Sequence, residues 1–379
     1  MNFELSDEQE ALREAARGAL SRHETLAAAR AAADGGERLD LWDVAREMGW
    51  PGLLVDEERG GAGLGALDAM LVMAECGRVL ASVPLLGHVP ATALLDGAPD
   101  ADPQLLRALA EGERRAALVP AQPPGDRHAG WTVDAVQGQG RPAAPTFDAE
   151  GAVTGAVAWV PDAPGADVLV VVGTDPEGAP CAVLVDTGAA GVTVAEVRRY
   201  DFTRLLGHVR LEGAPGQALD VDEDALRAAW FLAQALIAAE SLGSVEAALE
   251  SSVAYAKERY TFGRPIGSYQ AIKHGLTEVL RRLENARSLL YYAGWARQDA
   301  PREFPLAASA ARTAAGEALD HATREMISVF GGIGATWEHD APYFFRRAQL
   351  SDRLLGGTDG SADRVAGELL AQARAEAAS

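Results

Sequence analysis

The side chains best suited to chemistry lie in one short segment of the C-terminal half. It contains two guanidinium groups, a hydroxyl, aromatic rings and an amide, including Arg259, Thr261, Phe262, Arg264 and Gln270. Guanidinium groups bind phosphate through paired hydrogen bonds, and an aromatic ring stacks on a flat base. The segment therefore has the parts needed to hold a pyrophosphate and the base beside it. A helix–helix loop with solvated arginines would have the same composition.

A second segment offers backbone groups instead of side chains. Residues 330–338 place a helical stretch before the paired glycines Gly331 and Gly332. Glycine exposes its N–H and lets another molecule approach the backbone closely. The pair suits a phosphate, and it suits a tight helix C-cap equally well.

Two other features are better explained without chemistry. The glycine cluster at residues 60–65 follows no predicted strand, so we interpret it as a loop and not as a dinucleotide-binding fingerprint. His339 lies between Glu338 and Asp340, and none of the seven histidines has a neighbour at metal-ligand spacing. We expect no metal site, and we interpret His339 as part of a polar helix start.

The overall charge excludes several classes of partner. The 379 residues include 34 basic and 55 acidic side chains, so the net charge is −21. Nucleic acids and anionic membranes require basic surfaces, and neither is expected here. A polyanion such as coenzyme A would bind only at a local cluster of cations or at a helix N-terminus.

Cysteine usage and hydropathy indicate a cytoplasmic protein. Cys76 and Cys181 are far apart in the sequence, so a disulfide framework and a structural zinc site are not expected. The acidic, amphipathic N-terminus does not follow the pattern of a signal peptide. No unbroken apolar run reaches about 18 residues, which predicts no membrane span.

Helices that position these segments are expected at both ends of the chain. Residues 1–113 form a predicted helical domain, in which Ser6 and Gln9 make a capping box. Further helices are expected over residues 39–48 and through Val79. Residues 220–379 form a predicted helical bundle domain. One long helix there presents an apolar face of Ile272, Leu276, Val279, Leu280, Leu283 and Leu290.

The middle of the chain, residues 114–219, is rich in Gly, Pro and Val and predicts a small β domain. Its expected strands are short apolar runs between turn residues, at 168–172, 182–185, 192–197 and 208–211. The fold class is therefore α+β, with the β domain between an N-terminal helical domain and a C-terminal four-helix bundle.

Taken together, the motifs resemble the acyl-CoA dehydrogenase family over the whole chain. The family pattern R-x-x-F-G-x-x-I-x-x-x-Q is met by Arg259, Phe262, Gly263, Ile266 and Gln270. Residues 50–53 and 57–61 resemble the N-terminal helical domain of the family. Residues 201–203 resemble a strand near the end of its middle domain.

The resemblance implies FAD as cofactor and an acyl-CoA thioester as substrate. It implies a dimer of dimers in which the α proton is removed, the β hydrogen passes to the flavin as hydride, and a 2-enoyl-CoA forms. An electron-transfer acceptor is then needed to reoxidise the flavin. The implied cofactor contacts are Arg259, Thr261, Phe262, Gln270, Gly331, Gly332, Trp159 and Thr358.

The sequence departs from the family where the base should be. Relatives carry a Glu ahead of a Gly-Thr pair near the C-terminus, and the matching residue here is Gly356. Some members place the base on the first helix of the C-terminal domain, where this chain has Ala233. Neither side chain accepts a proton. The catalytic base is therefore unknown, and Asp359 is the nearest carboxylate in sequence.

The contacts to the flavin ring are altered as well. The family segment Trp-Ile-Thr-Asn corresponds to residues 159–162, where Trp159 remains but Pro161 has neither hydroxyl nor N–H. The stretch 118–130 lacks the family segment T-E-P-x-x-G-S-D, and Ser328 replaces a Gln. In this family each FAD contacts two subunits, and only the set contributed by the neighbour is largely intact here.

Three functions fit this pattern. The chain is one subunit of a heteromeric acyl-CoA dehydrogenase, with a related subunit supplying the base. Alternatively, it is a homo-oligomeric flavoenzyme of specialised metabolism that acts on an acyl thioester, bound to coenzyme A or to a carrier protein, with a non-standard base. The third possibility is a non-catalytic scaffold that retains the fold.

Overall fold

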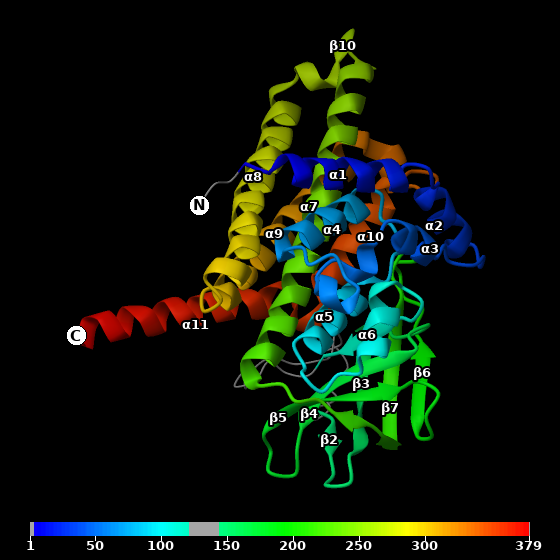
Figure 1. Ribbon diagram of the computed structural model, residues 1–379. Helices are drawn as coiled ribbons and strands as arrows, with labels where there is room; N and C mark the ends of the chain where they lie inside the picture. The colour runs from blue at the N-terminus through cyan, green and yellow to red at the C-terminus, as the bar shows by residue number, and fades with distance from the viewer. Residues whose placement is uncertain (1–3, 121–143, 379) are drawn as a thin grey trace.

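The computed structural model describes residues 4–120 and 144–378 (Figure 1). Short helices come first, a sheet follows, and long helices complete the chain, so the predicted α+β order is confirmed. The first six helices are α1 (Asp7–Leu20), α2 (Thr25–Ala33), α3 (Trp42–Glu47), α4 (Ala66–Arg78), α5 (Leu85–Asp96) and α6 (Pro103–Ala110).

Local sequence signals set the ends of these helices. At the start of α1, the Ser6 hydroxyl accepts a hydrogen bond from the Gln9 N–H, and the Gln9 side chain accepts one from the Ser6 N–H. The predicted capping box is therefore confirmed. α3 is shorter than the predicted helix 39–48, because it begins only at Trp42 and Gly49 takes a left-handed conformation after it.

The described strands between residues 116 and 218 form one eight-stranded sheet in the order β6–β7–β3–β2–β4–β5–β8, with β1 paired parallel to β4. Residues 168–172 of β4 are fully buried, which explains their unbroken apolar run. The strands are β1 (Ala116–Val119), β2 (Thr146–Phe147), β3 (Ala152–Pro161), β4 (Val168–Thr174), β5 (Pro180–Asp186), β6 (Val192–Glu196), β7 (Leu206–Pro215) and β8 (Gln217–Ala218).

The strand expected at residues 201–203 is absent: these described residues form a turn ahead of β7. The Asp201 carboxylate accepts hydrogen bonds from the N–H and the hydroxyl of Thr203, at 2.9 and 2.5 Å. An aspartate bonded two residues ahead stabilises a turn, and a strand cannot make that contact.

The C-terminal helices are α7 (Glu223–Glu258), α8 (Gln270–Asp299), α9 (Phe304–Phe330), α10 (Ala341–Ser351) and α11 (Gly357–Ala378). On α8, Val279, Leu283 and Leu290 are buried as predicted, but Leu280 is 46% exposed. The buried stripe repeats every three or four residues from Val279, and Leu280 lies one position outside it.

α7 is the central helix of the bundle and packs against α4, α8 and α9. Of the described helices, α7 is the one long and apolar enough to cross a membrane, yet 94% of its most apolar window is buried inside the protein. Its contact with α4 is unusually close. A Cβ added to Gly243 would lie 1.7 Å from the Ala74 carbonyl oxygen, so glycine is required at this crossing.

A buried ionic network joins the sheet to the bundle. Arg347 on α10 donates to Asp201 at 2.7 Å and to Glu240 on α7 at 2.6 Å, and it also donates to the Thr203 hydroxyl. Arg204 donates to the second oxygen of Glu240. Burial alone would raise the pKa of Asp201, but Arg347, Thr203 and Arg204 outweigh it and hold that pKa below its usual value.

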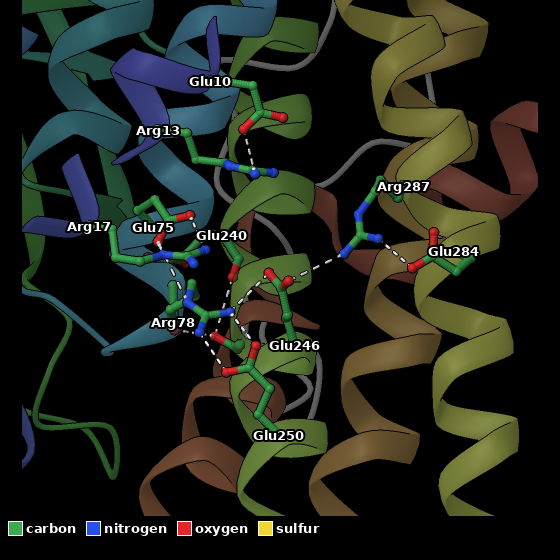
Figure 2. Close-up of polar contacts among 12 residues, drawn as sticks. Glu10, Arg13, Arg17, Glu75, Arg78, Glu240, Glu246, Glu250, Glu284 and Arg287 are labelled. Atoms are coloured by element: carbon green, nitrogen blue, oxygen red, sulfur yellow. Dashed lines mark hydrogen bonds and ion pairs between the residues drawn. The ribbon is translucent and has the colours of Figure 1, made fainter. Parts of the chain in front are cut away.

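A second ionic network lies nearer the surface and joins the N-terminal helices to the bundle (Figure 2). Glu75 on α4 is buried and accepts two hydrogen bonds of 2.9 Å from Arg17 on α1. Arg78 on α4 pairs with Glu246 on α7 at 3.0 Å, and Glu246 also pairs with Arg287 on α8 at 3.6 Å. Four helices are therefore connected by consecutive charge pairs.

We predict that Arg347→Met lowers the free energy of unfolding by about 3–5 kcal/mol, because Asp201 would remain buried and charged without its main partner. Urea unfolding at neutral pH would measure the change. Arg353→Met is the matched control, since Arg353 is exposed just after α10, and it should shift stability by less than about 0.5 kcal/mol. Equal effects of the two substitutions would contradict the role given to the network.

Candidate functional site

The segment 259–270 forms a hairpin between α7 and α8. Strands β9 (Tyr260–Thr261) and β10 (Arg264–Pro265) pair antiparallel. The two tip residues, Phe262 and Gly263, have φ values of 50° and 80°, which a two-residue turn of this kind requires. The Phe262 side chain is 93% exposed. The hairpin therefore presents an aromatic ring directly to solvent.

Neighbouring contacts keep the hairpin rigid. The Ile266 N–H donates to the Arg259 carbonyl at 2.7 Å, and the Tyr269 hydroxyl donates to the Thr261 carbonyl at 3.3 Å. The Arg264 guanidinium lies over the Tyr269 ring, 4.0 Å from its centroid. The side chains of Arg259 and Gln270 remain exposed and accessible to a ligand.

The paired glycines lie at the same end of the bundle. α9 ends at Phe330, whose ring stacks on Tyr255 in the last turns of α7 at 4.4 Å. Gly331 adopts φ 64° and ψ −137°, a conformation that favours glycine. No atom lies within 4 Å of a Cβ added to Gly331 or Gly332. The Gly331 N–H already donates to the Ile327 and Ser328 carbonyls, so this glycine forms the C-cap of α9, one of the two roles expected from the sequence.

Trp159 lies far from this group in the sequence and occupies a bulge in β3. The register between β3 and β7 shifts between Val157 and Val160, and Trp159 takes a left-handed φ of 60°. Its ring meets His208 edge-on at 4.7 Å and lies beneath the Arg199 guanidinium at 4.4 Å. Trp159 is 9% exposed, so protein side chains cover most of its ring.

A buried carboxyl follows the bulge. The Asp162 side chain accepts a hydrogen bond from the Gly87 N–H at 2.8 Å, which ties β3 to α5. Burial raises the pKa of Asp162 to about 6, although the Gly87 hydrogen bond and the Arg204 charge oppose the shift. The burial of this carboxyl was not predictable from the sequence, because its neighbours Gly87 and Arg204 come from distant segments.

The two positions where relatives carry the base come together in the structure. The Gln234 amide on α7 donates to the Leu355 carbonyl at 2.7 Å, so Ala233 and Gly356 both belong to the contact between α7 and this turn. A Cβ added to Gly356 would meet Trp230 at 3.8 Å. Neither position offers a proton acceptor, and Asp359 is exposed on α11.

Thr358 is buried and bonded to protein. Its hydroxyl accepts a hydrogen bond of 3.4 Å from Arg312 on α9, and Arg312 also donates to the Ser351 carbonyl. Arg312 is fully buried, and burial lowers its pKa to about 10. The sequence analysis missed Arg312, because an arginine in an alanine-rich helix gives no sign of its burial.

The expected contacts thus separate into two groups. Six of them lie at the hairpin end of the bundle, and Figure 1 shows β10 at the opposite end of the molecule from the sheet. Ala233 and Arg259 are 26 positions apart on α7 and its C-cap, or about 39 Å at the helical rise. The hairpin and the turn at Gly356 therefore lie far apart along the bundle.

The two groups differ in how well they fit a flavin dinucleotide. The exposed arginine, the amide and the open glycine backbone suit phosphate groups and an adenosine. The region of Trp159 and Gly356 offers a covered ring and no base. Residues 121–130, which lack the family segment, lie outside the described residues. Among the described residues, no group of three or more His, Cys, Asp or Glu could hold a metal ion.

Comparison with known proteins identifies the relatives. Two family profiles match, described as "Acyl-CoA dehydrogenase, N-terminal domain" over residues 6–113 and "Acyl-CoA dehydrogenase, C-terminal domain" over residues 232–370. Acyl-CoA dehydrogenase IpdE2 of Mycobacterium tuberculosis is 33% identical over 352 residues, covering 92% of this chain and 93% of the relative. IpdE2 of Mycolicibacterium smegmatis is 30% identical over 355 residues, covering 93% and 96%.

Solved structures give the same result. A variant of the Tcur3481-Tcur3483 steroid ACAD matches with a TM-score of 0.84 and 29% identity, covering 97% of this chain and 99% of that chain. The ChsE4-ChsE5 complex from Mycobacterium tuberculosis matches with a TM-score of 0.84 and 25% identity, covering 98% and 99%.

The raised pKa of Asp162 predicts a pH effect on stability. Between about pH 4 and pH 6 the folded chain binds this proton more readily than the unfolded chain, so stability falls as the pH rises through that window. Asp162→Asn carries no charge and should unfold at higher urea than the wild type at pH 7. The difference should shrink as the pH approaches about 4. A difference independent of pH would contradict the burial of a titrating group.

The conformation of Gly356 predicts a cost for any side chain there. Its φ is +86°, and no atom is closer to an added Cβ than Trp230 at 3.8 Å. We expect Gly356→Ala to lower the free energy of unfolding by about 1–2 kcal/mol through backbone strain alone. The control is Gly367→Ala in exposed α11, where alanine should be neutral or stabilising. Thermal unfolding of both variants would measure the difference, and equal stability of the two variants would contradict the strain assigned to position 356.

Proposed function

The chain belongs to the acyl-CoA dehydrogenase family, oxidoreductases acting on CH–CH groups, and from that premise we propose that it is one subunit of a heteromeric enzyme. The enzyme would dehydrogenate an acyl-CoA thioester between its α and β carbons. A related subunit would supply the base and the contacts to the flavin ring. This chain would hold the pyrophosphate and adenosine of the shared FAD.

The observation that carries the proposal is the absence of a proton acceptor at both base positions, in a chain whose hairpin motif at the far end of α7 is intact. The α proton of a thioester is weakly acidic, so its removal requires a positioned base. Gly356 and Ala233 supply none, and Pro161 has no N–H to donate. The hairpin residues, by contrast, are exposed at the far end of α7. A chain that lacks the base but keeps the hairpin is better suited to complete the active site of a neighbouring subunit than its own.

The residues of this chain have distinct roles in the proposal. Arg259 would pair with the pyrophosphate, and the lack of side chains at Gly331 and Gly332 would let a phosphate approach the backbone closely. Phe262 would pack beside the adenine, and Gln270 would contact the adenosine end. Bound FAD supplies the electron acceptor for the substrate hydride.

The comparisons favour a two-chain enzyme and a bulky substrate. One similar structure is a variant of the Tcur3481-Tcur3483 steroid ACAD, and another is the ChsE4-ChsE5 complex. By analogy, the partner would be a second acyl-CoA dehydrogenase subunit, and the acyl group of the coenzyme A ester would be large. We place the enzyme in the cytoplasm, with a separate electron-transfer protein as acceptor.

The first test is activity with and without a partner. We predict that this chain alone shows about 10²–10⁴-fold less anaerobic flavin bleaching by acyl-CoA esters than the co-expressed complex, because the base is missing. Sedimentation would report assembly in each preparation. Robust bleaching by this chain alone would favour the homo-oligomeric enzyme. Retained assembly without flavin or bleaching would favour a scaffold.

The second test concerns cofactor retention by the complex. Arg259→Ala removes a charge-assisted contact worth about 1.5–3 kcal/mol, so FAD affinity should fall at least about tenfold. Arg281→Ala is the matched control, since Arg281 is exposed on α8 and pairs with Glu278 within the same helix. Flavin content per complex, measured by absorbance after dialysis, would report the loss. Unchanged flavin content in Arg259→Ala would remove the hairpin from the site.

A further inference from the structure

A cavity of about 280 Å³ lies between the N-terminal helices and the sheet. One wall is the end of α2 with the segment that follows it, and the other is the connection between β6 and β7. Four arginines line it: Arg38, Arg198, Arg199 and Arg204. In a chain with a net charge of −21, this is a local cluster of cations. The proposed cofactor contacts are not among its lining residues.

The carboxylates around the cavity are largely committed to other partners. Glu196 pairs with Arg38 at 3.0 Å, and Asp201 pairs with Arg347 at 2.7 Å. Glu37 is exposed at the rim. Within residues 4–120 and 144–378, neither Arg198 nor Arg199 has a carboxylate at ion-pair distance. Neither charge is paired with a carboxylate, although the Arg199 guanidinium lies over the rings of Trp159 and Tyr200.

Unused hydrogen-bond donors accompany these charges. Arg204 is only 8% exposed, and although one of its terminal nitrogens donates to Glu240, its Nε has no partner in the described structure. The Nε atoms of Arg38 and Arg199 are also covered and unpartnered. Because these Nε atoms are covered by protein, an anion in the cavity would interact with the guanidinium charges and not with these donors.

We propose that this cavity binds a phosphoryl group. Converging guanidinium groups match the three acceptor oxygens and the double charge of a phosphoryl group, whereas a single carboxylate is satisfied by one arginine. The volume lies near the lower limit of about 300 Å³ for ligand pockets. It suits free phosphate or the phosphate end of a larger molecule such as a nucleotide.

Binding here would connect two parts of the fold. The cavity contacts the N-terminal helices through Arg38 and the sheet connection through Arg198 and Arg199. An anion shared by Arg38, Arg198 and Arg199 would link these two parts, and the Glu196 carboxylate would oppose it. The ligand would therefore stabilise the folded chain in proportion to its occupancy. This consequence can be measured without any enzymatic activity.

The experiment titrates inorganic phosphate into the full chain by calorimetry, with thermal unfolding at constant ionic strength set by chloride. Arg199→Gln and Arg198→Gln each remove one charge from the cavity. Arg198 is exposed, so Arg198→Gln provides the test should Arg199→Gln fail to fold. Arg210→Gln is the control, because Arg210 is exposed on β7 and pairs with Glu212.

We expect saturable phosphate binding to the wild type and to Arg210→Gln, with about tenfold weaker binding in the two cavity variants. Tighter binding of ADP than of phosphate, lost in the same variants, would identify the phosphate of a larger molecule as the ligand. Equal affinities would identify free phosphate. The absence of saturable binding to the wild type, or equal binding by all variants, would overturn the proposal.

Discussion

The arrangement of this protein depends on the buried guanidinium of Arg347. It joins α10 to the turn before β7 and to α7, and Arg204 completes the same network through Glu240. Buried charges are tolerated only when every partner is present, so these segments have one favourable arrangement relative to each other. α10 also leads directly into the turn that contains Gly356, while Asp201 and Arg204 line the arginine-rich cavity. The network thus positions the turn at Gly356 and the arginine-rich cavity.

The length of α7 is the second feature that determines how the parts of the molecule are arranged. Its 36 residues connect the buried centre of the bundle with an exposed hairpin. The close crossing at Gly243 and the charge pairs of Arg78 hold α4 against it. α8 and α9 support the far half of the same helix. A hairpin displayed at that distance from the turn at Gly356 fits the proposal that this chain completes the site of a neighbouring subunit.

The features that could be predicted from the sequence are those that depend on residues close together in the chain. The Ser6 capping box and the buried strand at 168–172 depend on neighbouring residues or on simple periodicity, and both are present. Features that depend on distant partners were not predictable. Asp201 was assigned to a strand because its link to Arg347, 146 positions away, is invisible in sequence. Contacts with distant segments likewise cause the raised pKa of Asp162, the burial of Arg312 and the grouping of arginines around the cavity. The roles of the cofactor residues remain predictions.

The exposed tip of the hairpin has a consequence for the life of the protein in a cell. A ring as open as that of Phe262 is costly to keep in water, and Ile333 and Trp337 are more than half exposed as well. A newly synthesised chain therefore exposes apolar side chains until a binding partner covers them. Surplus copies would be prone to aggregation and proteolysis, so selection should favour matched synthesis of this chain and whatever covers its hairpin.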